Sequence, residues 1–170
     1  MEFTSSLTEA ILLKRYKRFL ADVAVSKTDR RTIYCPNTGA MRGCNILGSR
    51  VWFSSSTNLR RKYPDTWELV EIDGGYLVAI NTQRTNQLIL EAIASGTITE
   101  IQGYKNIERE YALTHYNNRF DFRFSNHEYD KTPCFMEVKA VTLGDEICRG
   151  FYPDSNAEIT THQLKALIQL

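Results

Sequence analysis

The chain has 170 residues, of which 42% are hydrophobic and 24% charged, and its formal net charge is +1. This composition is typical of a globular protein with one domain or two small ones, and it excludes a wholly disordered chain. The sequence shows neither a secretory signal nor an apolar stretch approaching about 18 residues, so we expect a soluble, cytoplasmic protein with no membrane partner. The four cysteines form no C-x-x-C pair, which predicts reduced structural thiols.

The small net charge hides an asymmetry along the chain. Residues 10–62 contain twelve Lys and Arg against two acids, whereas residues 81–170 contain nine against twelve. A segment this basic attracts polyanions, and nucleic acid is the usual one. A solvated basic face around core aromatic residues is the ordinary alternative, and a membrane surface is less favoured because no clean amphipathic helix carries the charge. We predict a DNA-binding surface formed by Lys14, Arg15, Lys17, Arg18, Arg60, Arg61 and Lys62.

The first part of the chain alternates short β-like runs with turn signals. Residues 9–20 fit a helix or an entering strand equally well. The strands predicted after them cover residues 21–26, 31–34, 50–54, 67–72 and 76–80. Several short strands at this spacing, with a basic and aromatic-rich surface, predict a small β-barrel of the oligonucleotide-binding (OB) kind over residues 1–80.

Residues 81–170 have a different pattern. Thr85–Ala94 predicts a helix that Gly96 ends, and an apolar stripe predicts a second helix over residues 157–170. The strands predicted between them cover residues 97–101, 119–124 and 134–143, with an acid-rich segment at 106–113. Helices on either side of paired strands predict an α/β domain over residues 81–170.

The pattern with the most specific chemistry is Glu137-Val138-Lys139, which follows Asp121 on a neighbouring predicted strand. Because side chains alternate along a strand, Glu137 and Lys139 are expected on one face. Two carboxylates beside a lysine suit a divalent cation next to a phosphodiester. An ordinary strand with a cross-strand ion pair stays open as the alternative, since E-x-K is a common pattern.

Longer motifs extend over nearly the whole chain. They occupy residues 1–3, 14–23, 35–44, 61–69, 119–122, 137–143 and 152–154. Together they strongly resemble the bacterial sugar fermentation stimulation protein A family. The resemblance implies an α+β and α/β two-domain protein: an OB-like DNA-binding barrel followed by a domain similar to the PD-(D/E)xK nucleases. It also implies a role in regulating sugar (maltose) metabolism.

The resemblance also assigns roles to single residues. Asp121 and Glu137 match the metal-binding acids of the PD-(D/E)xK pattern, and Lys139 matches its catalytic lysine. Glu110 matches an upstream helical acid that completes the metal site in such enzymes. Mg²⁺ or Mn²⁺ is the cofactor that an active site of this type implies, and otherwise no cofactor is expected.

The chain departs from the family pattern at two motifs and in length. Asn118 stands where a serine usually precedes the Arg-x-Asp motif, and residues 159–164 replace a basic stretch. Typical members also continue for several tens of residues, adding a strand and a helix. We therefore expect the second domain to be incomplete, and either marginally stable or completed by self-association into a homo-oligomer.

Two functions follow from these patterns. The one we favour is DNA binding without sequence specificity, since no recognition helix stands out and a basic barrel binds phosphates. The other is a metal-dependent nuclease in which the barrel delivers DNA to Asp121, Glu137 and Lys139.

Overall fold

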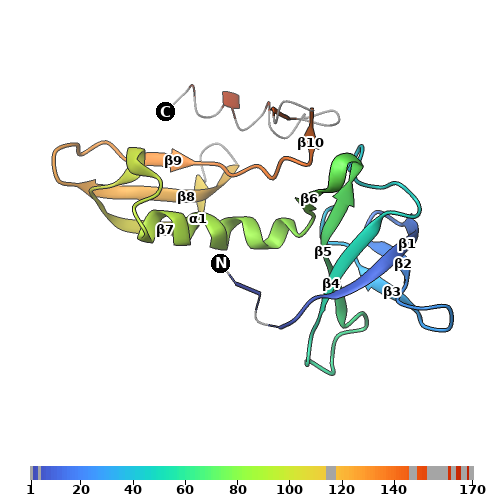
Figure 1. The fold of residues 1–170 in the computed structure, drawn as a ribbon. Helices are drawn as coiled ribbons and strands as arrows, with labels where there is room; N and C mark the ends of the chain where they lie inside the picture. Colours follow the sequence, from blue (N-terminus) through green and yellow to red (C-terminus); the bar gives the residue numbers. More distant parts are fainter. Residues whose placement is uncertain are drawn as a thin grey trace. The chain divides into compact units, whose positions relative to one another are not determined.

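The computed structural model describes residues 2–3, 5–113, 118–145 and 149–152, together with Thr161, Leu164, Lys165 and Ile168. The chain divides into two compact units, Met1–Arg84 with Ala140–Ser155 and Thr85–Lys139 with Asn156–Leu170 (Figure 1). Among the described residues, no helix is long and apolar enough to cross a membrane.

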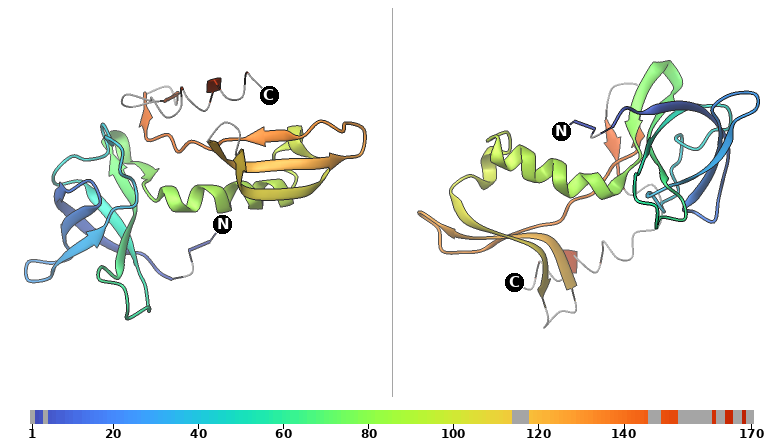
Figure 2. Two further views of the ribbon diagram at one scale, coloured as in Figure 1. Left: turned by 180° about the vertical axis from the view of Figure 1, so that it is seen from behind. Right: turned by 90° about the horizontal axis from the view of Figure 1, so that it is seen from below.

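The first unit is built on a six-stranded sheet. Its strands are β1 (Thr8–Tyr16), β2 (Leu20–Ala24), β3 (Arg30–Tyr34), β4 (Arg50–Ser55), β5 (Asp65–Ile72) and β6 (Tyr76–Ala79). They lie in the order β3-β2-β1-β4-β5-β6, and a parallel pairing of Tyr34 with Thr66 joins β3 to β5 (Figures 1 and 2). This pairing closes β1–β5 into a five-stranded barrel with β6 added outside β5. The predicted OB barrel is therefore confirmed.

Alternation along the strands decides which side chains fill the barrel. Ala10 and Leu12 of β1 are buried, whereas Ile11 between them is exposed. This alternation explains why residues 9–20, which fitted a helix or a strand, begin as strand β1. The core consists of Ala10, Leu12, Ala21, Val23, Ile33, Cys35, Met41, Cys44, Val51, Phe53, Trp67, Val70 and Ile80.

In the second unit a helix lies against a three-stranded sheet. The helix is α1 (Thr85–Ala94), and the strands are β7 (Tyr104–Leu113), β8 (Asn118–His127) and β9 (Cys134–Met136), in the antiparallel order β7-β8-β9. The helix packs on one face of the sheet, and the buried residues between them are Ile93, Ile101, Phe122 and Phe124 (Figure 2).

Helix α1 has the predicted bounds and the predicted stop. Gly96 has a φ of 74°, a left-handed conformation that glycine adopts without steric cost. The Gly96 amide donates to the carbonyl of Ile93 at 3.0 Å, and the Thr97 amide donates to that of Ala92 at 2.8 Å. These two bonds form a Schellman motif, which satisfies carbonyls that the helix end leaves open.

The remaining elements are short. They are the 3₁₀ turns η1 (Asp73–Gly75), η2 (Thr82–Arg84) and η3 (Thr99–Ile101), and the strands β10 (Leu143–Gly144) and β11 (Gly150–Phe151). β10 and β11 pair with each other in the first unit.

Several sequence predictions for the second half are wrong. The strand predicted at residues 97–101 is replaced by η3, and Glu110, predicted on a helix, lies in strand β7. The strand predicted at residues 134–143 is broken, because β9 ends at Met136 and pairing resumes only at β10. Glu137 and Lys139 therefore lie outside a strand. The helix predicted over residues 157–170 lies largely outside the described residues. Within this range the structure describes Thr161, Leu164, Lys165 and Ile168, and all four are helical.

Candidate functional site

Asp121 is the centre of a polar cluster in the second unit. Its Oδ1 accepts a hydrogen bond from the Asn86 side-chain amide at 2.7 Å, and its Oδ2 accepts one from the Val138 backbone amide at 2.7 Å. Asn86 lies in the first turn of α1, and Val138 follows strand β9. Two donors on opposite oxygens fix the orientation of the carboxylate and stabilise its negative charge.

The bond to Val138 brings the predicted site residues together. Val138 stands between Glu137 and Lys139, so its contact with Asp121 holds the whole triplet beside β8. Lys139 Nζ and the Glu137 carboxylate form an ion pair, with side chains that are 29% and 17% exposed. The structure thus collects Asp121, Glu137 and Lys139 in one region, through a side chain-to-backbone bond and not through strand pairing.

Glu110 lies at the level of Asp121 in the sheet, but its carboxylate is paired with Arg119. The ladder pairs Arg109 with Phe122 and Tyr111 with Phe120, which puts Glu110 at the level of Asp121. Its φ is 51°, and its carboxylate lies 3.7 Å from Nη1 of Arg119. Within the described residues, no three His, Cys, Asp or Glu side chains gather closely enough to hold a metal ion. The metal-ligand set of Asp121, Glu137 and Glu110 stays a prediction.

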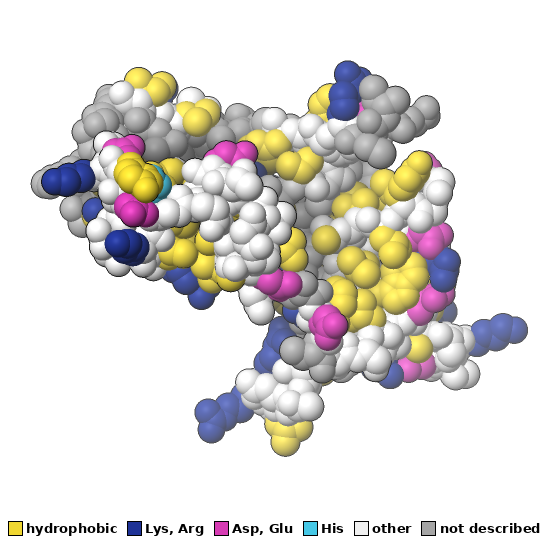
Figure 3. Space-filling view, turned by 60° about the vertical axis from the view of Figure 1, so that its left-hand side comes forward, with side chains coloured by type: hydrophobic (Ala, Val, Ile, Leu, Met, Phe, Trp, Pro, Cys, Tyr) yellow, Lys and Arg dark blue, Asp and Glu magenta, His cyan; other side chains and the backbone are white. Residues whose placement is uncertain are grey.

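The cations predicted to bind DNA lie around two loops of the barrel. Lys14 and Arg15 lie near the end of strand β1, and the hairpin tip, Lys17–Phe19, connects β1 to β2. Arg60, Arg61 and Lys62 lie in the β4–β5 loop, residues 56–64. Figure 3 shows one face of the molecule, on which Lys and Arg side chains project at the ends of protruding segments.

These cations differ in how far they are engaged by the protein itself. Arg15 Nη2 donates to three backbone carbonyls, and Arg61 Nη2 donates to Thr66 Oγ1 at 3.1 Å. Lys14 and Lys62 lie over tyrosine rings, at 5.6 and 5.5 Å from the ring centroids. Lys17, Arg18 and Arg60 have side chains with no hydrogen bond or ion pair to any described residue. Their charge is open to solvent and to a ligand.

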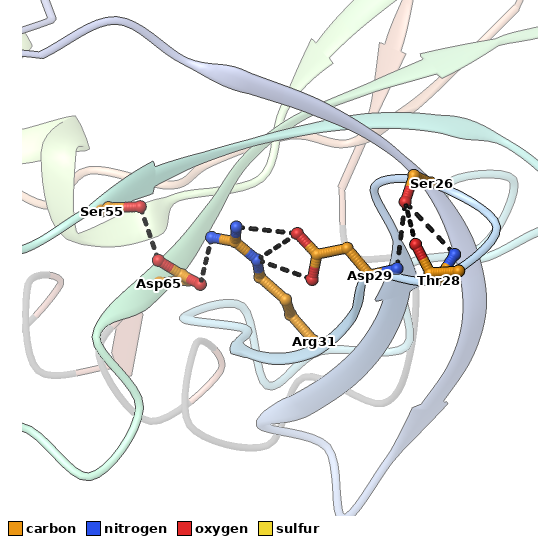
Figure 4. Close-up of polar contacts among 6 residues, drawn as sticks. All are labelled: Ser26, Thr28, Asp29, Arg31, Ser55 and Asp65. Carbon is orange, nitrogen blue, oxygen red and sulfur yellow. Dashed lines mark hydrogen bonds and ion pairs between the residues drawn. The ribbon is translucent and has the colours of Figure 1, made fainter.

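Arg31, which belongs to the same basic segment, is neutralised within the barrel. Its guanidinium donates to both carboxylate oxygens of Asp29, at 3.2 Å to Oδ1 and 2.9 Å to Oδ2, and its Nη1 lies 3.5 Å from Oδ2 of buried Asp65 (Figure 4). Hydrogen bonding to Asp29 raises the pKa of Arg31. Asp65 in turn accepts a hydrogen bond from Ser55 Oγ at 2.6 Å. The count of basic residues therefore overstates the charge that this segment offers to a ligand.

Comparison with known proteins identifies the family. Residues 13–80 match the family model described as the SfsA N-terminal OB domain, and residues 83–170 match the Sugar fermentation stimulation protein RE domain. The chain belongs to the sugar fermentation stimulation protein family. The first of these matches covers the end of β1 and all of β2 to β6.

Relatives within the sugar fermentation stimulation protein family are similar along the whole chain. The Sugar fermentation stimulation protein homolog of Shewanella halifaxensis (strain HAW-EB4) is 44% identical over 170 residues, which are 100% of this chain and 70% of the relative. The homolog of Psychromonas ingrahamii (strain DSM 17664 / CCUG 51855 / 37) is 44% identical over 168 residues, covering 97% of this chain and 73% of the relative.

A solved structure supports the fold. The structure of Pyrococcus furiosus SfsA in complex with Ca²⁺ has a TM-score of 0.84 and 24% sequence identity, and the match covers 100% of this chain and 69% of that one. At this identity the likeness shows the fold alone.

In this member of the sugar fermentation stimulation protein family, Asn86 is the site residue that sequence reasoning missed. An asparagine at the start of a helix is usually explained as a residue that favours helix starts. Its partner Asp121 lies 35 positions further along the chain. No local pattern links the two, because only the packing of α1 on β8 brings them together.

Proposed function

We propose that this protein binds DNA without sequence specificity through the barrel of its first unit. The observation that carries the proposal is the position of Lys17, Arg18 and Arg60, whose charges are not paired with any described residue. They lie on the β1–β2 and β4–β5 connections, the loops with which OB barrels bind oligonucleotides. Cations on these two loops favour contact with phosphates, which carries no information about base sequence.

The family name supports a biological context for this binding. The relatives are named sugar fermentation stimulation protein homologs. We extend the proposal to regulation of sugar (maltose) metabolism, with DNA bound by the barrel as the physical basis. Expression of maltose-utilisation genes in a strain lacking the protein tests this part, and unchanged expression contradicts it.

The DNA-binding proposal predicts a lower salt dependence when the β4–β5 loop loses its charge. Replacing Arg60, Arg61 and Lys62 by alanine should reduce the slope of log K against log salt by about 2 to 3, because each lost phosphate contact removes about 0.9 on duplex DNA. Fluorescence anisotropy with a labelled duplex, between about 50 and 200 mM salt, measures the slope.

Lys27→Ala is the matched control for this experiment. Lys27 is exposed and lies between β2 and β3, away from both loops along the chain. Its loss should leave the slope unchanged. An unchanged slope in the Arg60, Arg61 and Lys62 variant would place the DNA surface elsewhere.

A second function, divalent-metal-dependent hydrolysis of phosphodiester bonds, is favoured by the contact between Asp121 and Val138. We propose that the second unit is a domain similar to the PD-(D/E)xK nucleases, with Asp121 and Glu137 as metal ligands. Their carboxylate oxygens are the hard donors that Mg²⁺ or Mn²⁺ prefers. Each Asp121 oxygen keeps a second lone pair beside its hydrogen bond.

The solved structure of Pyrococcus furiosus SfsA is described as a complex with Ca²⁺, which supports binding of a divalent cation by this family. Such an ion, when bound, supplies Lewis-acid stabilisation of charge on the phosphate. In this chain Lys139 would add a positive charge beside the reacting group, and Asn86 and the Val138 amide would keep Asp121 in place.

A further inference from the structure

We infer that the hairpin tip, Lys17–Phe19, is a preformed binding platform for single-stranded nucleic acid. Lys17 and Arg18 contact the phosphates of the strand, and an unpaired base stacks on Phe19. The inference rests on the proposed binding of DNA by the barrel, and it adds the form of nucleic acid that the barrel prefers.

The backbone of the tip is a tight hairpin turn in which two successive residues have positive φ. Lys17 and Arg18 have φ values of 51° and 65°, in the left-handed region. Glycine and asparagine are the residues usually found there, because a longer side chain costs free energy in this conformation. A type I′ hairpin turn requires positive φ at both central residues, and here both positions carry a cation at the end of the hairpin.

Hydrogen bonds from Arg15 and from the Cys35 amide also hold the backbone of the tip. Arg15 Nη2 lies 2.9 Å from each of the carbonyl oxygens of Arg18, Asn37 and Gly39. The Cys35 amide donates to the carbonyl of Phe19 at 2.8 Å. The backbone at Arg18 and Phe19 is therefore fixed before a ligand binds, so binding loses little conformational entropy there. Arg15 acts here as a positioning residue, because its Nη2 donates to these carbonyls instead of to phosphates.

The exposed ring of Phe19 supplies a flat surface on which a base can stack. Its side chain is 42% exposed, whereas the neighbouring Leu20 is 3% exposed and packs into the barrel. Phe53 and Trp67, which also lie in the basic half of the sequence, are fully buried. Proteins that bind single strands combine cations with exposed aromatic rings on which bases stack. The bases of a duplex are already stacked and paired, so Phe19 favours a single strand.

Fluorescence anisotropy with a labelled oligo-dT of about 20 nucleotides and a duplex of about 20 base pairs tests the inference, since an OB fold covers about 4 to 16 nucleotides. The wild type should bind the single strand more tightly. Phe19→Ala should weaken single-strand binding about 5- to 100-fold, the effect of losing one stacked base, and change duplex binding less than about twofold. Phe19→Tyr keeps the ring and should bind like the wild type.

A second variant separates binding from folding. Lys17→Asn combined with Arg18→Gly removes both charges and also relieves the left-handed strain, so it should raise the thermal midpoint. The same variant should lower the salt slope for oligo-dT by about 1.4, since each single-strand phosphate contact contributes about 0.7.

The outcomes distinguish this inference from the proposal beneath it. If the wild type binds neither oligonucleotide, DNA binding by the barrel is wrong, and the inference falls with it. If the wild type binds DNA but prefers the duplex, or Phe19→Ala leaves oligo-dT binding unchanged, only the inference is overturned. A double variant with an unchanged oligo-dT salt slope would overturn the role of Lys17 and Arg18.

Discussion

Replacing Glu68 by alanine should lower the free energy of unfolding by about 3 to 5 kcal/mol, the usual loss when one partner of a buried ion pair is removed. Glu68 lies on β5 and is 2% exposed. Its carboxylate accepts hydrogen bonds from Arg84 Nε at 2.7 Å and Arg84 Nη2 at 2.8 Å. Such a two-pronged contact is among the strongest that a carboxylate makes.

Two neutral donors complete the Glu68 network. Ser54 Oγ on β4 donates at 2.6 Å, and the Asn81 side-chain amide donates at 2.9 Å. The network therefore ties β4, β5 and the η2 turn around one buried charge. In Glu68→Ala, the half-buried Arg84 guanidinium and these donors lose their shared acceptor, so the loss exceeds that of one hydrogen bond.

The same network predicts a pH dependence. Burial raises the pKa of Glu68, but hydrogen bonds from Arg84, Ser54 and Asn81 and the charge of Arg84 outweigh it, so the pKa of Glu68 lies below its ordinary value. The stabilisation is then complete above the unfolded-state pKa of about 4.3 and is lost as pH falls through the lower folded-state pKa. Urea unfolding between about pH 7 and 3 should show wild type and Glu68→Gln converging in stability as the pH falls.

Glu71→Ala provides the matched control for Glu68→Ala. Glu71 lies on the same strand and pairs with Arg50, which also pairs with Glu9, but its side chain is 28% exposed and that of Arg50 is 47% exposed. Solvent screens such a pair, so we expect a loss below about 1 kcal/mol. Equal losses in Glu68→Ala and Glu71→Ala would show that burial adds nothing to the Glu68 network.

Local patterns were enough to predict the barrel and helix α1. Short β-like runs separated by turn signals predicted the barrel strands, and Gly96 predicted the end of α1, because both signals depend on neighbours in the sequence. Hydrogen bonds between residues far apart in the sequence could not be predicted from such local patterns. Strand β9 ends at Met136, and the Val138 amide donates to the side chain of Asp121, which lies 17 residues before Val138 in the chain. A continuous strand was therefore the wrong expectation.

The positive charge that is available to a ligand was also not predictable from the sequence alone. Sequence counting gives Arg31 and Arg50 the same weight as Lys17 and Arg18, yet the structure pairs each of the first two with carboxylates from other strands or turns. Glu68 looks like an ordinary polar residue of a strand, and its partner Arg84 is 16 residues away. The candidate residues were found by type and spacing, but their availability depends on partners that only the fold supplies.

Replacing Glu137 by alanine should lower metal-dependent DNA cleavage at least about 10²- to 10³-fold, the loss typical of removing one electrostatic group from a catalytic site. The change removes a proposed metal-ligand carboxylate together with its ion pair to Lys139. DNA binding should stay intact, because the proposed binding loops belong to the other unit. Labelled single- and double-stranded DNA, incubated with Mg²⁺, Mn²⁺ or EDTA, measures both effects when cleavage and gel retardation are compared.

Two further variants test whether a loss of cleavage in Glu137→Ala is due to the proposed metal site. Glu128→Ala removes an exposed acid of the same unit and should cleave like the wild type. Asn86→Ala removes the donor to Asp121 Oδ1 and should reduce cleavage about 10- to 100-fold, the usual effect of losing a residue that orients a metal ligand. Cleavage that persists in Glu137→Ala would exclude Glu137 as a metal ligand. Wild-type protein that retards DNA in every metal without cutting it would exclude the nuclease and leave binding by the barrel, because Asp121, Glu137 and Lys139 would then be assembled without supporting catalysis.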